Sequence, residues 1–414
     1  MAQQFLHKQT IKNKDSICDW YKKKSAQVAV PFYSSYDIRD SGYKVTNVDA
    51  NIYPAGFNNI CPTDKETAVD LVEKYFTLHY AKPIKKIVLV TEEHTQNAFY
   101  WENISSLMDM ITNSGREVRV AFINPVPEGY TLQSSTGREI PVYSVSGNGG
   151  IFPDFNPDLI ISNNDFSLSF DEWAGTLQKP MNPPRELGWY QRKKSRYFKF
   201  YNQLVNEFCE VAEIDPFLMR VETEIFENFD IGSETSRAEL AGRVEHMLTN
   251  LKKTYAEKGI TQEPFVFVKN NSGTYGLAVI RVGNPQEVKE WSYKSRKKMK
   301  AAKGGRDVEE VIIQEGIPSI VQSDGASAEP VIYMLGCELA GGFLRTHAEK
   351  DATESLNSPG AVYKKLCVTD LQVKPEGCPM ENVYGWSAKL GLLAIGLEAQ
   401  EMGVQFKEYQ KASC

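Results

Sequence analysis

Five short apolar segments in the second half of the chain constrain the fold more than any other feature. They are FVFVK (265–269), LAVIRV (277–282), EEVIIQE (309–315), PVIYML (330–335) and GGFLRTH (341–347). Their length and their content of Val, Ile and Phe are typical of strands, and several of the gaps between them are short enough for hairpins. Hairpins join antiparallel neighbours, so we expect an α+β unit built on antiparallel sheets with flanking helices.

The first half of the chain has a different pattern, in which helices and strands alternate. Apolar strands are predicted at 86–91, 117–123 and 158–162, and helices at 63–80 and 99–114. This order predicts a mostly parallel sheet with helices on its faces, which is an α/β arrangement.

Local signals refine this reading. Thr63 is the expected N-cap of the first helix, because Glu66 follows it at the spacing of a capping box. The stretch 33–62 is rich in Tyr, Asn, Asp and Gly and has little periodicity, so we expect an ordered loop region there. The prolines of KPMNPPREL (179–187) interrupt both helix and strand, and they predict an α/β N-terminal domain (1–180) and an α+β domain (181–414).

Composition limits the class of partner. The 414 residues are 42% apolar and carry a net charge of −6, which favours a globular protein with small substrates over one that binds nucleic acid or an anionic membrane. The seven cysteines form no Cys-x-x-Cys pair, and the start of the chain has no apolar leader. We therefore expect a cytoplasmic protein without a disulfide framework, in which Cys337 and Cys367 are packing residues.

The segment EPFVFVKNNSGTYGLAVIRV (263–282) has the strongest chemical signal. An apolar strand ends in Lys269, a loop with Ser272, Gly273 and Gly276 follows, and a second strand begins. Glycines let backbone N–H groups surround polyphosphate oxygens, while the lysine adds a fixed positive charge. The alternative is an ordinary hairpin whose glycines serve only the turn.

The segment VIIQEGIPS (311–319) adds to this signal. It places Gln314, Glu315 and Ile317 where a buried strand runs into a linker, and such a place offers an apolar slot and polar edges to an adenine ring. Between the two segments lies the basic run 293–306, which is either a solvated helical face or a lid over an anionic ligand.

These two segments share their order with further motifs of a known family. Together with GWYQRKKSRYF (188–198), AEPVIYMLG (328–336) and GGFLRTHAEKDATESLNSPG (341–360), the chain resembles the proteobacterial glutamate–cysteine ligases, which are built on an ATP-grasp scaffold and are related to glutathione synthetase-like ligases. The resemblance implies that residues 181–414 form an ATP-grasp domain with a lid and flap at 263–306. It also implies a ligase that uses ATP and Mg²⁺ to form γ-glutamylcysteine from glutamate and cysteine through an acyl phosphate.

The same resemblance implies roles for single residues. Lys269 would contact the nucleotide phosphates, Arg345 would neutralise the transferred phosphoryl group, and both would be catalytic. The loop residues Ser272, Gly273 and Gly276 would cover the phosphates, and Gln314, Glu315 and Ile317 would frame the adenine.

The resemblance also implies that Glu354 and Asn357 bind magnesium, and carboxylate and amide oxygens suit that ion. Their Glu-x-x-Asn spacing departs from the Glu-x-Asn pair of the family, and Asn357 also matches a different family element, the loop before the last helix. Glu329 and Glu338 are further candidates, and each is equally well explained as a solvated residue at a strand end.

The amino-acid site is predicted in the segment 37–59. Arg39 and Lys44 are candidates for binding carboxylates, and Asp40, Asp49 and Asn51 for binding ammonium groups.

TEEHT (91–95) is a second candidate for this site, because it follows a strand directly. The alternative for all these residues is loop structure with local backbone contacts. Two other functions stay open: another carboxylate–amine ligase, and a nucleotide-binding protein without turnover. A homo-oligomer is also possible.

Overall fold

The computed structural model describes residues 2–93, 95–273, 278–291, 295, 297, 308–373 and 380–413. Gly276, His94 and nearly all of the basic run 293–306 lie outside these residues, and the interpretations made for them stay predictions. In the described part of the chain, no helix is both long and apolar enough to cross a membrane.

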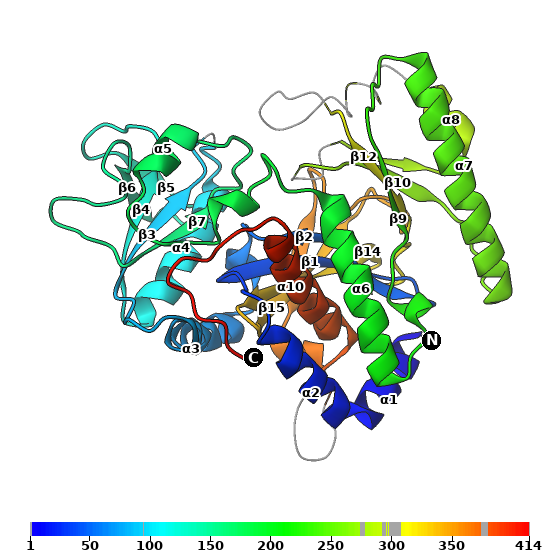
Figure 1. Cartoon of the computed structure of the whole chain (residues 1–414), viewed down its shortest axis with the longest axis horizontal. Coiled ribbons are helices and arrows are strands. Elements are labelled where there is room, and N and C mark those ends of the chain that lie inside the picture. The colour runs from blue at the N-terminus through cyan, green and yellow to red at the C-terminus, as the bar shows by residue number, and fades with distance from the viewer. Residues whose placement is uncertain are drawn as a thin grey trace.

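A central antiparallel sheet joins the two ends of the chain. Its strand order is β16-β15-β14-β1-β2, and β13 pairs with β14. The strands are β1 (Tyr33–Asp40), β2 (Val45–Asn51), β13 (Gln322–Ser323), β14 (Ala326–Leu335), β15 (Glu338–His347) and β16 (Val362–Leu366). Figure 1 shows β1 and β2 in blue beside the yellow and orange strands from the second half of the chain.

The prediction of a loop region at 33–62 was therefore wrong over β1 and β2. Tyr33, Tyr36, Ile38 and Val45 are completely buried, although polar residues separate them. The sequence looked irregular because these strands also carry Asp, Asn and Arg side chains, and some of those side chains line a pocket instead of meeting solvent.

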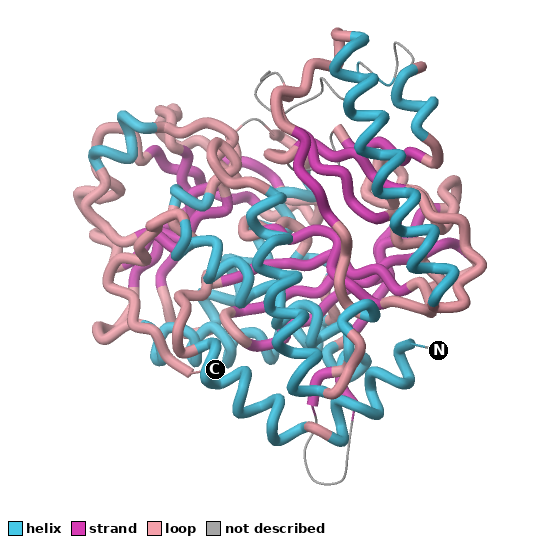
Figure 2. Tube along the Cα trace, turned by 45° about the vertical axis from the view of Figure 1, so that its right-hand side comes forward, coloured by secondary structure: helices cyan, strands magenta, loops and turns pink. Residues whose placement is uncertain are grey.

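A second antiparallel sheet has the order β11-β10-β12-β9. Its strands are β9 (Thr223–Phe226), β10 (Val266–Asn270), β11 (Val279–Val282) and β12 (Val311–Glu315), and it packs on α7 (Glu234–Glu257) and α8 (Pro285–Lys289). The strands predicted within the segments 263–282 and 309–315 are confirmed. Figures 1 and 2 show this sheet with α7 and α8 at one end of the molecule, beside the central sheet.

The parallel sheet predicted for the first half is present, with the order β5-β6-β4-β3-β7-β8. Its strands are β3 (Lys86–Thr91), β4 (Glu117–Phe122), β5 (Thr131–Gln133), β6 (Glu139–Ser144), β7 (Leu159–Asn163) and β8 (Met181–Asn182). All pairs except the hairpin of β5 and β6 are parallel. The neighbouring helices are α3 (Pro62–His79), α4 (Ala98–Asn113) and α5 (Asp171–Thr176).

The prediction of Thr63 as N-cap was wrong. Helix α3 begins at Pro62 and its N-cap is Cys61. Proline suits the first helical position because that position needs no N–H donor, so the helix starts before the apparent capping box.

The mixed α/β fold with antiparallel sheets and flanking helices is thus confirmed. The division near residue 180 stays a prediction; strands β1 and β2, which precede it, pair within the same sheet as β14, which follows it. Cys337, in the turn between β14 and β15, is disulfide-bonded, so the expectation that it only packs was wrong. Spacing along the chain could not reveal this bond, because a disulfide depends on distance in space.

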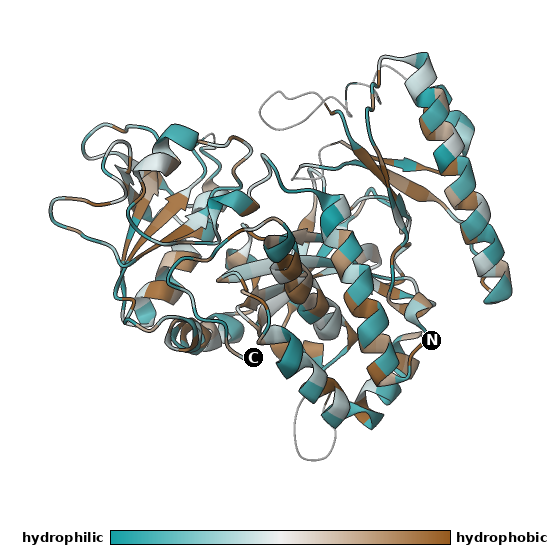
Figure 3. Ribbon diagram, in the orientation of Figure 1, coloured by the Kyte–Doolittle hydropathy of each residue, from teal (hydrophilic) through white to brown (hydrophobic). Residues whose placement is uncertain are grey.

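Helix α10 (Val383–Glu401) packs on β1, β2 and β14 of the central sheet, and α3 packs on β14 and β15. Helices α1 (Ala2–Lys12) and α6 (Lys194–Ala212) pack on α10, and α2 (Lys14–Ser25) packs on α6. Figure 3 shows that α10 is mostly apolar, whereas α7 is largely hydrophilic. Gly391 of α10 lets the helix approach β1, because a Cβ atom there would lie 2.5 Å from Cε1 of Tyr36.

We expect Gly391→Ala to destabilise the protein by about 1–3 kcal/mol, because the added methyl group overpacks the buried ring of Tyr36. The control is Gly242→Ala in α7, where a Cβ atom would have no neighbour within 4 Å. Helix propensity predicts that this control gains up to about 1 kcal/mol. Urea denaturation measures the free energy of unfolding of both variants, and equal values for the two would contradict the packing argument.

Candidate active site

A pocket that is open to solvent lies between the central sheet and the four-stranded sheet. Strands β1, β2 and β14 form one wall, and β10, β11 and β12 form the other. The residues predicted from the sequence that line it are Arg39, Asp49, Lys269, Gln314, Glu315, Ile317 and Asn357, together with the further candidate Glu329. The fold therefore brings several residues of the predicted site together at one place.

One side of this pocket is apolar. Val48, Phe267, Val279 and Ile317 contribute to its lining. The first three come from facing strands, and Ile317 follows β12 at the start of the linker. Two apolar walls with polar groups at the edge suit a flat heteroaromatic ring.

Lys269 of β10 is nearly buried in the pocket, with 8% of its surface exposed. Its Nζ donates to Oε1 of Gln314 at 2.6 Å and to the backbone oxygen of Val48 at 3.1 Å. Burial lowers the pKa of Lys269 to about 8, although the nearby Asp49 opposes this shift. An ammonium group whose hydrogen-bond acceptors are both neutral is well suited to bind an incoming anion.

Four charged residues form a network beside this lysine, and all but the half-buried Asp37 are buried. Nη1 of Arg345 donates to Oδ2 of Asp37 and to Oε1 of Glu329, both at 2.7 Å. Nε of Arg39 pairs with the other oxygen of Glu329 at 2.6 Å. Glu329 therefore bridges two guanidinium groups, and it is not the solvated strand-end residue that the sequence left as an alternative.

The two acids of this network are not equivalent. Burial raises the pKa of Asp37, and the attraction of Arg345 only partly offsets this effect. Burial also acts to raise the pKa of Glu329, but Arg39 and Arg345 outweigh it and the pKa is lowered. For Arg345, burial acts to lower the pKa, but Asp37 and Glu329 raise it well above its usual range.

Asp49 of β2 forms an ion pair with Lys194, at the start of α6. Burial alone would raise the pKa of Asp49, but the ammonium groups of Lys194 and Lys269 outweigh it and lower the pKa. The carboxylate of Asp49 is thus shared between the ammonium groups of Lys194 and Lys269. Both lysines line the pocket, where they can attract an anion.

A second, larger pocket of about 1690 Å³ adjoins the first and shares Asp37, Asp49 and Asn357 with it. Arg345, Asn51 and Gly273 also line it. Its other walls carry the amides of Asn58, Asn59, Asn97 and Asn103 and the rings of Tyr100, Trp189, Tyr333, Phe343 and Tyr363, among others. Such a lining suits small ligands with several polar groups.

Lys44 and Glu315 are engaged with each other. Nζ of Lys44 lies 2.7 Å from both carboxylate oxygens of Glu315 and 4.3 Å from the ring centre of Phe217. The hydroxyl of Tyr255 donates to Glu315 at 2.9 Å. Lys44 does not line either of these two pockets, so its predicted role in binding a carboxylate has no support from its position.

Glu354 is also engaged elsewhere. Its carboxylate pairs with Lys350 at 2.8 Å and accepts the backbone N–H of Asp351 at 3.1 Å. The hydrogen bond from Lys350 is the main reason that the pKa of Glu354 is lowered. Only its backbone oxygen reaches the network, as an acceptor for Arg39 at 2.8 Å.

The remaining candidates are placed as follows. Ser272 donates to the backbone oxygen of Arg192 at 3.1 Å, near the start of the flap. Glu338 pairs with Lys74 at the surface, as a strand-end residue does. In TEEHT, Glu92 accepts the N–H of Asp165 at 2.9 Å and so braces a loop.

Asp40 accepts a hydrogen bond from the hydroxyl of Tyr384 at 2.8 Å and lines neither of the two pockets.

Sequence reasoning missed Asp37 and gave Lys194 little weight. Asp37 and Arg39 stand two positions apart in β1, so they share one face of the strand. This alternation was a usable signal once the segment was taken as a strand. Nothing local marked Lys194, because its partner Asp49 is 145 positions away.

Comparison with known proteins now adds to the geometry. The model of the family described as glutamate–cysteine ligase matches residues 7–399. The chain belongs to the glutamate–cysteine ligase family. The resemblance stated from the sequence motifs is thereby confirmed.

A solved structure supports the assignment. A crystal structure of a proposed gamma-glutamylcysteine synthetase from Methylobacillus flagellatus KT is 31% identical to the chain, with a TM-score of 0.84 and 96% of each chain covered. Comparison with curated proteins found no match.

Two distant structures are a glutathione synthetase-like effector from Globodera pallida, at 11% identity with 87% and 86% of the two chains covered, and a D-cycloserine synthetase, at 12% identity with 77% and 82% covered. Both have a TM-score of 0.39, and no argument rests on them.

The buried charge of Lys269 predicts a change in stability. Its pKa is about 8 in the folded protein and near 10.5 when unfolded. Below pH 8 both states are protonated and the buried charge costs stability; between pH 8 and 10.5 the unfolded state binds more protons, so stability rises with pH. We expect Lys269→Met to be more stable than the parent at pH 7, by about 1–3 kcal/mol, and to lose this advantage near pH 10.

Urea denaturation at several pH values tests this. The control is Lys199→Met, whose ammonium group is exposed beside Glu401, and its effect should stay within about 0.5 kcal/mol. If Lys269→Met were less stable than the parent at pH 7, the buried charge of Lys269 would not be destabilising the folded protein.

Proposed function

We propose that the protein is an ATP-dependent ligase that forms γ-glutamylcysteine from glutamate and cysteine. The observation that carries this proposal is the pocket between two antiparallel sheets, where Lys269 and the network of Arg345, Asp37 and Glu329 meet an apolar slot. Membership of the glutamate–cysteine ligase family supports the choice of substrates.

In this proposal the first pocket binds ATP. The adenine occupies the slot of Val48, Phe267, Val279 and Ile317, and the phosphates extend toward Lys269. Ser272 and Gly273 begin the flap over the phosphates. Bound phosphate supplies the countercharge that Lys269 lacks, so binding raises the pKa of this lysine.

The reaction has two steps. An oxygen of the γ-carboxylate attacks the terminal phosphorus of ATP, ADP leaves, and an acyl phosphate forms. The amine nitrogen of cysteine then attacks the acyl carbon, phosphate leaves, and the nitrogen loses a proton. No protein nucleophile takes part, so catalysis rests on positioning and on the positive charges of Arg345 and Lys269, which offset the charge on the phosphoryl oxygens.

The residues present also fit magnesium, which prefers oxygen ligands. Asp37 and Asn357 each line both pockets. Glu329 lies near Asp37, because both carboxylates contact Arg345. We assign the ion to these three residues. When bound, it neutralises phosphate charge. The role of Glu354 as a magnesium ligand stays a prediction, and the contacts of its carboxylate do not support it.

The amino acids occupy the second pocket in this proposal. Asp49 and Asn51 provide acceptors for an ammonium group, and Arg345 lies where the first pocket meets the second. The side-chain amides around this pocket can bind both carboxylate and ammonium groups, since each amide donates and accepts hydrogen bonds.

Phosphate release from Mg·ATP tests the proposal. We expect release only when glutamate and cysteine are both present, with γ-glutamylcysteine identified by mass spectrometry. Release with another amine would replace the substrate and keep the ligase. Binding of ATP without release under any substrate pair would refute the ligase and favour a nucleotide-binding protein.

Replacing Arg345 tests the charge network. Arg345→Lys keeps one positive charge but cannot contact Asp37 and Glu329 through a planar fork. We expect kcat to fall by about 10²-fold or more while the circular dichroism spectrum is retained. Arg243→Lys, at the exposed pair with Glu224, is the matched control and should retain full activity. A kcat within twofold of the parent for Arg345→Lys would argue against a role in the transition state.

The pKa of Lys269 also predicts proton uptake. At pH 8 about half of this lysine is neutral in the free protein, so binding of Mg·ATP should take up about half a proton. Calorimetry in buffers of different ionisation enthalpy measures this number. Lys269→Arg removes the uptake, because arginine stays charged. Equal uptake by the two proteins would assign the proton to another group.

A further inference from the structure

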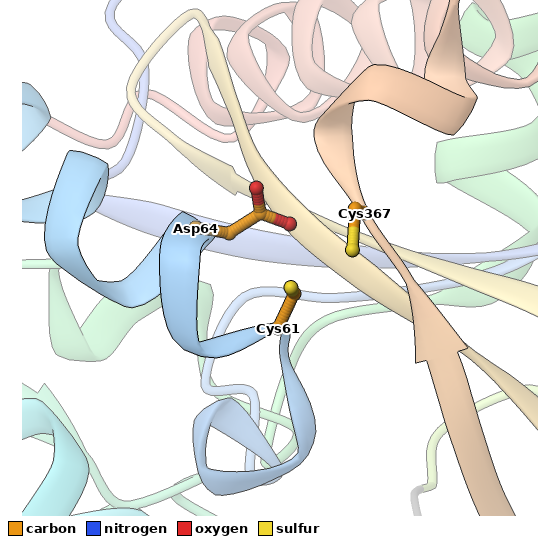
Figure 4. Close-up of side chains that lie close together, drawn as sticks. All are labelled: Cys61, Asp64 and Cys367. Atoms are coloured by element: carbon orange, nitrogen blue, oxygen red, sulfur yellow. The ribbon is translucent and has the colours of Figure 1, made fainter.

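Cys61, Asp64 and Cys367 meet at a point that the proposed reaction does not use. Cys61 is the N-cap of α3, Asp64 lies in the first turn of that helix, and Cys367 follows β16. Figure 4 shows the two sulfur atoms and the carboxylate turned toward one another from two separate segments. The three potential ligand atoms lie within 4.8 Å of one another.

Asp64 is a buried carboxylate without a cation. It is 6% exposed, and it accepts the backbone N–H of Val368 at 2.9 Å, but it forms no ion pair with any residue that the structure describes. The buried acids Glu315, Glu329 and Glu398 each pair with a lysine or an arginine, whereas the buried Asp40 accepts hydrogen bonds from the hydroxyl of Tyr384 and the backbone N–H of Gly42. Only the single backbone donor of Val368 is found for Asp64 among the described residues. Because a buried charge without a partner is costly, the position of Asp64 indicates a place for a cation.

Backbone N–H groups lie close to both sulfur atoms. The backbone N–H groups of Thr63 and Asp64 lie close to the sulfur of Cys61, at the positive end of α3. The sulfur of Cys367 accepts the N–H of Asp370. Such donors orient and stabilise thiolate ligands, and the partial exposure of Cys367 leaves a route for an ion to enter. The hydrogen bond with Cys61, burial and the nearby Asp64 raise the pKa of Cys367 to about 12, so a cation that binds there must displace the proton of this thiol.

We propose that Cys61, Asp64 and Cys367 bind one borderline-soft divalent cation, with zinc as the natural choice. Two thiolates and a carboxylate provide three negative charges for two positive ones, and three protein ligands leave a fourth position for water. Thiolate ligands favour such an ion over magnesium, which prefers the oxygen ligands of the pocket. The site is thus chemically separate from the proposed ATP site.

A bound cation would connect two walls of the larger pocket. Asn58 and Asn59, just before Cys61, line one side, and Val362 and Tyr363, in β16 before Cys367, line another. Cross-linking the start of α3 to the end of β16 would restrict the separation of these walls. The expected result is a more stable protein, because the cation binds the folded state.

The test uses the full chain, reduced and freed of metal, with no nucleotide or amino acid present, so that failure of the ligase proposal cannot affect it. Cadmium is the probe, because its bonds to thiolates absorb in the near ultraviolet. We expect the absorption to saturate at one equivalent, zinc to displace it, protons to be released, and the melting temperature to rise.

Three variants and one control decide the assignment. Cys61→Ser and Cys367→Ser should reduce or abolish the absorption, and Asp64→Asn should weaken binding by about tenfold or more while leaving both thiolates in place. Cys18→Ser, which removes a free cysteine elsewhere, should bind as the parent does. Circular dichroism checks that each variant is folded, and Asp64→Asn remains informative if a serine variant is not.

Two results would overturn the proposal. One is cadmium absorption that persists unchanged in Asp64→Asn and in a folded cysteine variant. The other is a parent protein that binds no cadmium after reduction and instead links Cys61 to Cys367 on exposure to air, as mass spectrometry of the peptides would show. That second result would identify the pair as a redox couple.

Discussion

The two antiparallel sheets can pack face to face only because the charged side chains buried in and between them form ion pairs. Glu329 of β14 lies between Arg39 and Arg345, and Asp37 completes the network within the central sheet. Lys44 and Glu315 form a further buried pair that links the central sheet to β12. Breaking such a pair costs about 3–5 kcal/mol, because the remaining partner stays buried and charged. Removing a single charged partner from β1 or β14 would therefore destabilise the fold.

Function and stability make opposite demands at this interface. Arg345 has two carboxylate partners, whereas the acceptors of Lys269 within the described residues are neutral, and burial lowers the pKa of this lysine. In the proposed reaction this deficit allows the site to receive ATP, since the phosphates complete the charge balance. A protein that fully neutralised its own pocket would be more stable but would bind anions less well.

Local patterns predicted much of the fold and part of the candidate site. Strands β10, β11 and β12 and the parallel sheet follow from apolar patterns within single segments. Lys269, Gln314 and Ile317 were found because strand ends and small-residue loops carry a recognisable chemical pattern. Glu354 and Lys44 fitted their patterns equally well, but their actual partners, Lys350 and Glu315, were decided by the three-dimensional arrangement.

The sequence by itself determined the class of fold, the family and the strand that ends in Lys269, because each of these depends on patterns of residues that are close together in the chain. Only the tertiary structure decided that β1 and β2 enter the central sheet, that Asp37 and Lys194 join the site, and that Cys61 meets Cys367. Those contacts join residues that are far apart in sequence, and periodicity within a segment has no information about which distant partner a side chain will meet.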